Sequence, residues 1–146
     1  MRLSHCFMLS LFLFFFSSSV WALNDRDLPR EEARAKNGNV ASQVQVGDYY
    51  YSRGRYAKAL PWYRLAAKNG QYDARQRLSY MYEMGEGTDR DLLKAYVLTR
   101  KIQNEYPNRH SDSLETTERR VRELAGQLTP EQLKQAEQLI KKDWKF

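Results

Sequence analysis

One tetrapeptide occurs twice in this chain, and its spacing constrains the fold more than any other feature. Ala35-Lys-Asn-Gly38 and Ala67-Lys-Asn-Gly70 are identical and lie 32 positions apart. A period of about 20 to 50 residues is typical of repeat proteins, in which each unit is one supersecondary element. The chain is therefore expected to fold by stacking similar units, an architecture that favours binding over catalysis.

The similarity extends beyond the tetrapeptide. Equivalent positions follow each copy in the same order: Val46-Gly47 and Leu78-Ser79, Tyr50 and Tyr82, Lys58-Ala59 and Lys94-Ala95. Glycines stand between the helical patterns at Gly54 in the first copy and at Gly85 and Gly87 in the second. Small residues let two helices approach closely, and apolar residues at helical spacing form one buried stripe. The predicted unit is a helix, a glycine-bearing turn and a second, antiparallel helix.

This unit predicts an all-α fold, a short α-solenoid of about two helix pairs with a C-terminal helical cap. The expected boundaries are a leader and helical cap over 23–37, a first repeat over 38–70, a second over 71–106 and capping helices over 107–146. Within the first of these, Leu23–Leu28 is expected to be a flexible leader. Helix-pair arrays usually need about three units to be stable, so two repeats and a cap reach that threshold.

Capping signals locate two helix starts. Thr88 with Asp91 three positions later predicts a cap before Leu92, and Thr129-Pro-Glu-Gln132 predicts an N-cap, a proline in the first turn and a reciprocal glutamine. A stripe then follows that should dock on the preceding helices: Leu133, Ala136, Leu139, Ile140 and Trp144.

The helix expected from about Tyr56 contains a proline. Pro61 removes one backbone hydrogen bond and is expected to bend the helix. Trp62, Leu65 and Ala66 are expected to point inward, which makes this segment a packing element.

The first 22 residues have the composition of an export signal. Arg2 is their only charged side chain, an apolar run covers 7–16, and Val20 and Ala22 suit the positions before a cleavage site. We expect cleavage after Ala22 and a periplasmic or secreted product, with an uncleaved signal anchored to the inner membrane as the alternative. The single cysteine, Cys6, lies in this segment, so the mature chain is expected to lack disulfides.

The charge balance argues against nucleic-acid binding. The formal net charge is +6, but basic and acidic residues alternate closely, as in Arg30-Glu-Glu-Ala-Arg34. A nucleic-acid footprint needs a clustered basic face. The expected partner is a protein, with no nucleic acid, and contact with a membrane only through the export signal.

From about residue 30 to residue 105 the chain resembles the Sel1-like repeat, a relative of the tetratricopeptide repeat. The second copy matches at Asn69-Gly70, Ala74, Leu78-Ser79, Tyr82, Gly85-x-Gly87, Asp91 and Lys94-Ala95, and the first at Gly38, Val46-Gly47, Tyr50, Lys58-Ala59, Trp62-Tyr63 and Ala66-Ala67. The first copy departs in having Gly54 alone at its turn, and the second in having Ser79 in place of a glycine. The resemblance implies a small exported bacterial member of the family that acts as an adaptor or scaffold, without catalytic residues common to the family.

The residues themselves give little support for catalysis. His110, the one histidine of the mature chain, lies in a polar stretch where a solvated turn explains it, and Glu83 and Glu86 lack the sugar cleft that a glycosidase pair needs. One histidine and no cysteine also leave metal binding without its usual ligands. We therefore expect no enzyme, no cofactor and no metal.

In the related tetratricopeptide geometry, the first helix of each pair lines a concave groove. The positions that map there, and that form the predicted binding face, are Val44, Asp48, Tyr51, Gln76, Tyr80 and Glu83. Aromatic rings with polar tips beside carboxylates suit a peptide-binding surface. The chain is predicted to be an exported interaction module. The alternatives are an envelope glycan-binding or glycan-cleaving protein and a structural subunit of an envelope complex, in which Trp144 and Phe146 would be exposed.

Overall fold

The computed structural model describes residues 23–106 and 111–141, which form seven α-helices and no strand. The helices are α1 (Leu28–Lys36), α2 (Val40–Ser52), α3 (Tyr56–Lys68), α4 (Tyr72–Met84), α5 (Leu92–Glu105), α6 (Ser111–Ala125) and α7 (Pro130–Lys141). None of the described helices combines the length and the apolar character that crossing a membrane requires. The predicted signal over 1–22, His110, Trp144 and Phe146 lie outside the described residues.

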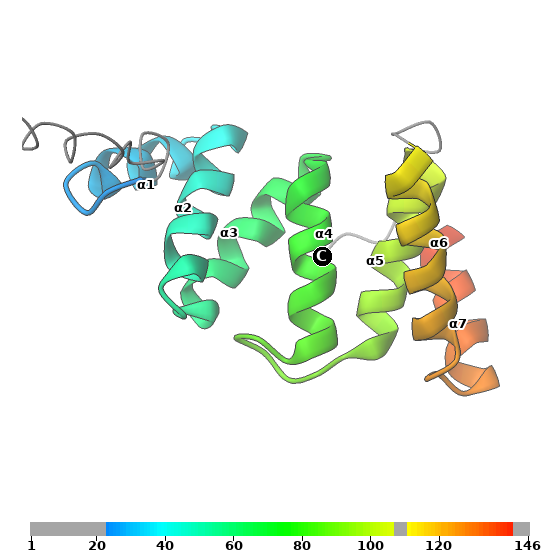
Figure 1. Ribbon diagram of the computed structural model, residues 1–146. Helices are drawn as coiled ribbons and strands as arrows, with labels where there is room; N and C mark the ends of the chain where they lie inside the picture. Colours follow the sequence, from blue (N-terminus) through cyan, green and yellow to red (C-terminus); the bar gives the residue numbers. More distant parts are fainter. Residues whose placement is uncertain (1–22, 107–110, 142–146) are drawn as a thin grey trace, which may run out of the picture.

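The helices stack in chain order. α2 packs on α3 and α4 on α5 as pairs, α3 joins the two pairs by packing on α4, and α1 covers α2. Figure 1 shows them succeeding one another from α1 at one end of the molecule to α6 and α7 at the other, where both contact α5. The described chain is thus an α-solenoid of two helix pairs with helical caps, and the predicted fold class is confirmed.

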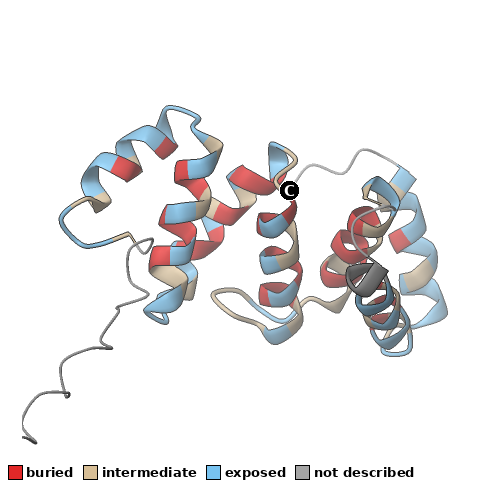
Figure 2. Ribbon diagram, turned by 45° about the horizontal axis from the view of Figure 1, so that its top comes forward, coloured by how far each residue is buried: buried red, intermediate tan, exposed pale blue. Residues whose placement is uncertain are grey.

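One apolar core continues along the stack from α3 to α7. Its buried side chains lie where helices face each other, which Figure 2 shows as buried segments on the inner sides of α3, α4 and α5. The largest fully buried ones are Tyr63, Tyr82, Leu78, Met81, Leu98 and Leu124. Ala136 of α7 is also fully buried, and Leu133, Leu139 and Ile140 pack beside it, so the C-terminal stripe docks as predicted.

The register of α3 differs from the expectation. Ala66 is buried and Trp62 half-buried, but Leu65 is 42% exposed. The buried stripe runs instead through Ala59, Leu60, Tyr63, Ala66 and Ala67. Because α3 packs against both α2 and α4, two neighbours decide which of its side chains are buried, and Leu65 is not one of them. The helix continues through Pro61, and the bend there stays a prediction.

Caps at two helix starts were expected, and one of them differs. Asp91, not Thr88, caps α5, and its side chain accepts a hydrogen bond from the Lys94 amide at 2.9 Å. The box before α7 is confirmed. Thr129 Oγ1 accepts from the Gln132 amide at 3.2 Å, and Gln132 Oε1 accepts from the Thr129 amide at 2.9 Å.

The leader before α1 makes hydrogen bonds within itself and to α2, and its flexibility stays a prediction. The Asn24 side chain accepts hydrogen bonds from the amides of Arg26 and Asp27. Tyr49 of α2 donates its hydroxyl to Asp25 at 2.5 Å, and this hydrogen bond lowers the pKa of the Asp25 carboxyl. The contact of Asp25 with Tyr49 ties the leader to α2 over 24 positions, which a local sequence pattern does not encode.

Candidate functional site

The first helices of the two pairs, α2 and α4, each leave one side uncovered. On each helix the exposed residues recur at equivalent positions: Ala41, Gln45, Asp48 and Ser52 on α2, and Asp73, Arg77, Tyr80 and Met84 on α4. The half-buried Val44, Tyr51, Gln76 and Glu83 border this stripe. We call these twelve residues, together with Glu86 and Arg120, which contact them, the first-helix face.

All six predicted site residues belong to this face, but they are not equally accessible. Asp48 and Tyr80 are exposed, whereas the other four are half-buried. Val44 packs against the core, and Gln76 donates a hydrogen bond to the Tyr72 hydroxyl at 2.8 Å. Val44 is thereby occupied in packing against the core, and the Gln76 amide is occupied by a hydrogen bond within α4.

Tyr51 makes more of the contacts between helices than the other predicted site residues of the face. Its hydroxyl donates to Glu86 Oε2 at 2.7 Å, and the Arg77 guanidinium lies 4.7 Å from its ring centroid. Burial and then the hydrogen bond to Glu86 raise the pKa of Tyr51 to about 12. Rings of Tyr56 and Tyr63 pack at 5.0 and 6.2 Å. Tyr51 therefore links α2 to α4 and to the loop after α4, and its polar tip is already bound.

A second arginine connects α4 to α6 in a similar way. The Arg120 guanidinium lies 5.8 Å from the Tyr80 ring centroid, and it donates to Glu83 Oε2 at 2.7 and 3.1 Å. An arginine from one helix thus approaches a tyrosine of the preceding first helix twice in the molecule. Sequence reasoning missed both arginines, because neither is near its tyrosine along the chain.

Asp48 has a packing role besides its exposure. Tyr63 of α3 donates its hydroxyl to Asp48 Oδ1 at 2.6 Å. Burial of the Tyr63 ring, reinforced by this hydrogen bond, raises the pKa of Tyr63. The carboxylate remains at the surface and is held in one orientation.

Met84 is the exposed apolar residue of the face that sequence reasoning missed. It is 56% exposed, while Tyr80 one turn before it is 39% exposed. Among the described residues these two and Leu65 are the exposed large hydrophobic side chains. The signal that could have identified Met84 is its spacing of four positions from Tyr80, which puts both on one side of a helix.

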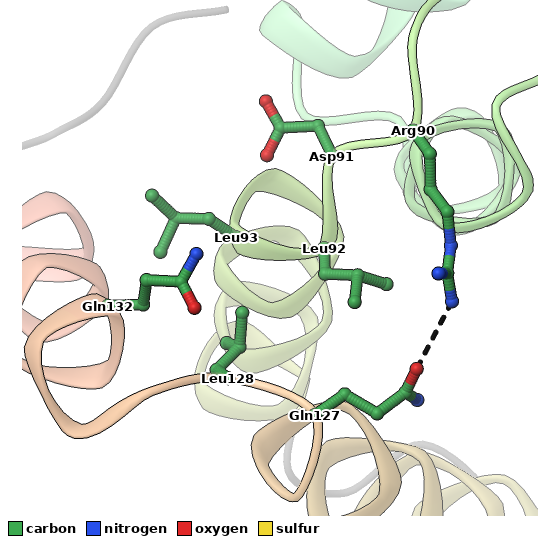
Figure 3. Close-up of a pocket in the computed structure, with 7 residues that line it drawn as sticks. All are labelled: Arg90, Asp91, Leu92, Leu93, Gln127, Leu128 and Gln132. Atoms are coloured by element: carbon green, nitrogen blue, oxygen red, sulfur yellow. Dashed lines mark hydrogen bonds between the residues drawn. The ribbon is translucent and has the colours of Figure 1, made fainter.

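A small pocket lies elsewhere, between the start of α5 and the turn from α6 to α7. Figure 3 shows its lining, with Leu92, Leu93 and Leu128 in the middle and the polar side chains of Arg90, Asp91, Gln127 and Gln132 around them. Its volume is about 270 Å³. Arg90 at its rim is already bound to the Glu83 carbonyl at 2.9 Å and to Gln127 Oε1 at 3.1 Å. The pocket could accept one aliphatic side chain, but it brings no reactive groups together.

Within residues 23–106 and 111–141, no three histidine, cysteine or carboxylate side chains lie close enough to hold a metal ion. Three carboxylates of the first-helix face, those of Asp48, Glu83 and Glu86, are instead engaged by tyrosines and an arginine, as described above.

Comparison with known proteins identifies the fold. No family model matches the chain. A stretch of 56 residues is 39% identical to the ERAD-associated E3 ubiquitin-protein ligase component HRD3 of Candida glabrata, covering 38% of this chain and 7% of that protein.

The crystal structure of c5321, a protective antigen present in uropathogenic Escherichia coli strains displaying an SLR fold, superposes with a TM-score of 0.65 at 24% identity. It covers 77% of this chain and 24% of that one. The chain spans less than a quarter of the length of both proteins. It has the fold of Sel1-like repeat (SLR) proteins, as the resemblance implied.

Proposed function

We propose that this protein is an exported interaction module that binds a segment of another protein on its first-helix face. One observation carries the proposal. Tyr80 and Met84 present exposed apolar surface one helical turn apart, on a helix whose other side is in the core. Apolar surface beside a polar border is typical of the anchoring centre of a protein interface.

The charged side chains around this surface also favour binding. Arg120 is held between Tyr80 and Glu83, and Arg77 lies over the ring of Tyr51. Side chains that are already ordered lose little conformational freedom when a partner docks. The face is therefore suited to bind without rearranging.

The comparisons support a role of this kind in general terms. HRD3 is, by its name, a component of a larger ligase, and the matched stretch is a small part of it. We carry over only the general role of holding protein partners. That role needs no catalytic residue, and we accordingly propose a non-enzymatic adaptor.

Export rests on the sequence of residues 1–22, and we propose cleavage after Ala22 into the periplasm or the medium. N-terminal sequencing of the protein recovered from its own host should give Leu23 as the first residue. Recovery of the intact N-terminus in the membrane fraction would instead support the uncleaved anchor.

The binding role is tested by site-specific crosslinking in that host. A photoreactive amino acid at position 80 or 84 should capture the same partner protein. The matched control is position 65, because Leu65 is comparably exposed but lies on α3 outside the face. Absence of any captured protein, or equal capture from position 65, would show that the first-helix face is not the binding surface.

A further inference from the structure

The first-helix face has a charge opposite to that of the whole chain, and this bears on the chemistry of its partner. The chain carries a formal net charge of +6. On the face, however, the carboxylates Asp48, Asp73, Glu83 and Glu86 outnumber the arginines Arg77 and Arg120. They still do so when Arg90, which donates to the Glu83 carbonyl at 2.9 Å, is counted with the arginines. No lysine belongs to the face. A locally acidic surface on a basic protein favours a partner segment that brings positive charge.

The positions of the available carboxylates sharpen this inference. Glu83 is paired with Arg120, and Glu86 accepts the hydroxyl of Tyr51. Asp48 and Asp73 are exposed, and neither forms an ion pair within the described residues. A cation on a partner would therefore find these two carboxylates without displacing an existing ion pair.

The distance between Asp73 and Tyr80 along α4 predicts the spacing of two residues in the bound segment. Asp73 and Tyr80 lie on the same side of the helix, and seven residues of α-helix rise about 10 Å. A peptide in the extended polyproline II conformation covers about 9 Å with three residues, and its three residues per turn bring side chains three positions apart to the same side. A segment lying along α4 would thus present a basic residue to Asp73 when its apolar side chain, three positions away, contacts Tyr80 and Met84.

We propose that the partner is an extended, basic segment in which a bulky apolar residue is followed or preceded at three positions by Lys or Arg. This proposal rests on the binding role of the first-helix face and adds the chemistry of the ligand. The apolar side chain supplies the anchor, and the cation supplies selectivity against acidic segments.

Binding of synthetic peptides tests the proposal. Three fluorescent peptides share a central Trp and differ in the residues three positions on either side, which are Lys, Ser or Glu. Fluorescence anisotropy with the purified chain lacking residues 1–22 should rank them Lys, Ser, Glu. The Lys peptide should bind on the order of tenfold more tightly than the Glu peptide at low salt, and added salt should reduce the difference.

Matched charge reversals assign the effect to the face. Asp73→Lys should weaken binding of the Lys peptide severalfold and Asp73→Asn should weaken it less, whereas Glu137→Lys on the exposed side of α7 should leave it unchanged. Circular dichroism establishes that each variant remains folded. Equal affinities for the three peptides, a preference for Glu, no binding of the Lys peptide, or equal weakening by Glu137→Lys would each overturn the proposal.

Two further outcomes separate this proposal from the binding role on which it rests. If positions 80 and 84 capture a partner but the Lys peptide has no advantage, the adaptor role stands and the basic chemistry is wrong. If the protein alone sediments as a dimer that Met84→Glu dissociates, the face is occupied by a second copy, and the basic-segment proposal is likewise wrong.

Discussion

Gly87 lies against the backbone of the preceding helix pair so closely that no side chain fits. A Cβ atom there would come within 2.5 Å of the Tyr56 carbonyl carbon and 2.6 Å of the Ala57 nitrogen, and φ is +72°. Both the space and the backbone conformation therefore require glycine. This one contact lets the loop after α4 fold against the start of α3.

Replacing Gly87 should destabilise the protein more than replacing a glycine that has room. We expect Gly87→Ala to lower the free energy of unfolding by about 3 kcal/mol or more, because backbone atoms must move as well as φ. Gly54→Ala is the control, since Gly54 has φ +68° but nothing within 4 Å of its Cβ position. It should cost about 1 kcal/mol. Urea unfolding measures both, and equal losses would contradict the close contact.

The hydroxyl of Tyr51 predicts a pH dependence of stability. The pKa of Tyr51 is raised to about 12, so the folded state retains a proton that the unfolded chain loses near pH 10. Stability from this group is complete below about pH 10 and is lost as pH rises toward 12. Between about pH 9 and pH 11, Tyr51→Phe should lose less unfolding free energy than the unmodified protein. An equal loss in urea titrations would contradict the assignment.

At the scale of helices, the two helix pairs use different residues at the same point of contact between their first and second helices. In the first pair Gly47 faces Tyr63, and a Cβ at Gly47 would approach the tyrosine ring to 2.8 Å. In the second pair the equivalent residues are Ser79 and Thr99, whose hydroxyls lie 2.8 Å apart. Ser79 also donates to the Ala95 carbonyl at 3.0 Å. The first pair thus places a small residue, Gly47, opposite a large one, Tyr63, where the second pair has two residues of intermediate size, Ser79 and Thr99.

A double-mutant cycle tests this pairing. Gly47→Ser should destabilise by overpacking and Tyr63→Thr by leaving a cavity. The double variant should cost less than the sum by about 1 kcal/mol, because each change relieves the other. Gly47→Ser combined with Leu124→Ala of α6 is the control and should be additive. Additivity in both cycles would mean that residues 47 and 63 do not determine the approach of α2 and α3.

At the scale of the whole molecule, the cap completes a core that the two pairs leave open. α6 and α7 both cover α5, and they bring the fully buried Leu124 and Ala136 into the core. In a linear array each unit is stabilised by its neighbours, so removal of an end unit weakens the rest.

Removing the C-terminal cap, α6 and α7, should therefore also destabilise the helices that remain. A chain that ends at Tyr106 is expected to lose its cooperative thermal transition, because the outer face of α5 becomes exposed. Thr129→Ala removes only the cap of α7, and it should lower stability by about 1 kcal/mol while leaving one transition. Circular dichroism follows both. A sharp transition in the truncated chain would show that the two pairs are stable alone.

Much of the architecture could be predicted because its signals are local. The repeated tetrapeptide, the glycines after helices and the box at Thr129 and Gln132 involve residues a few positions apart, and the structure has the corresponding helices and cap. The prediction that Leu65 points inward was wrong, because α3 packs against two helices and its buried face depends on both. Met84 was not among the predicted site residues, because its exposure depends on which faces of α4 the neighbouring helices leave uncovered.

The sequence by itself determined that this chain is an array of helix pairs with a C-terminal cap, because helix formation and pairing depend on periodicity within a short window. Only the tertiary structure decided which side chains of α2 and α4 are available to a partner. Tyr51 is bound by Glu86, 35 positions away, and Glu83 by Arg120, 37 positions away, while Tyr80 and Met84 remain exposed. Such contacts follow from how the helices stack, so the acidic, aromatic face appears only in the folded array.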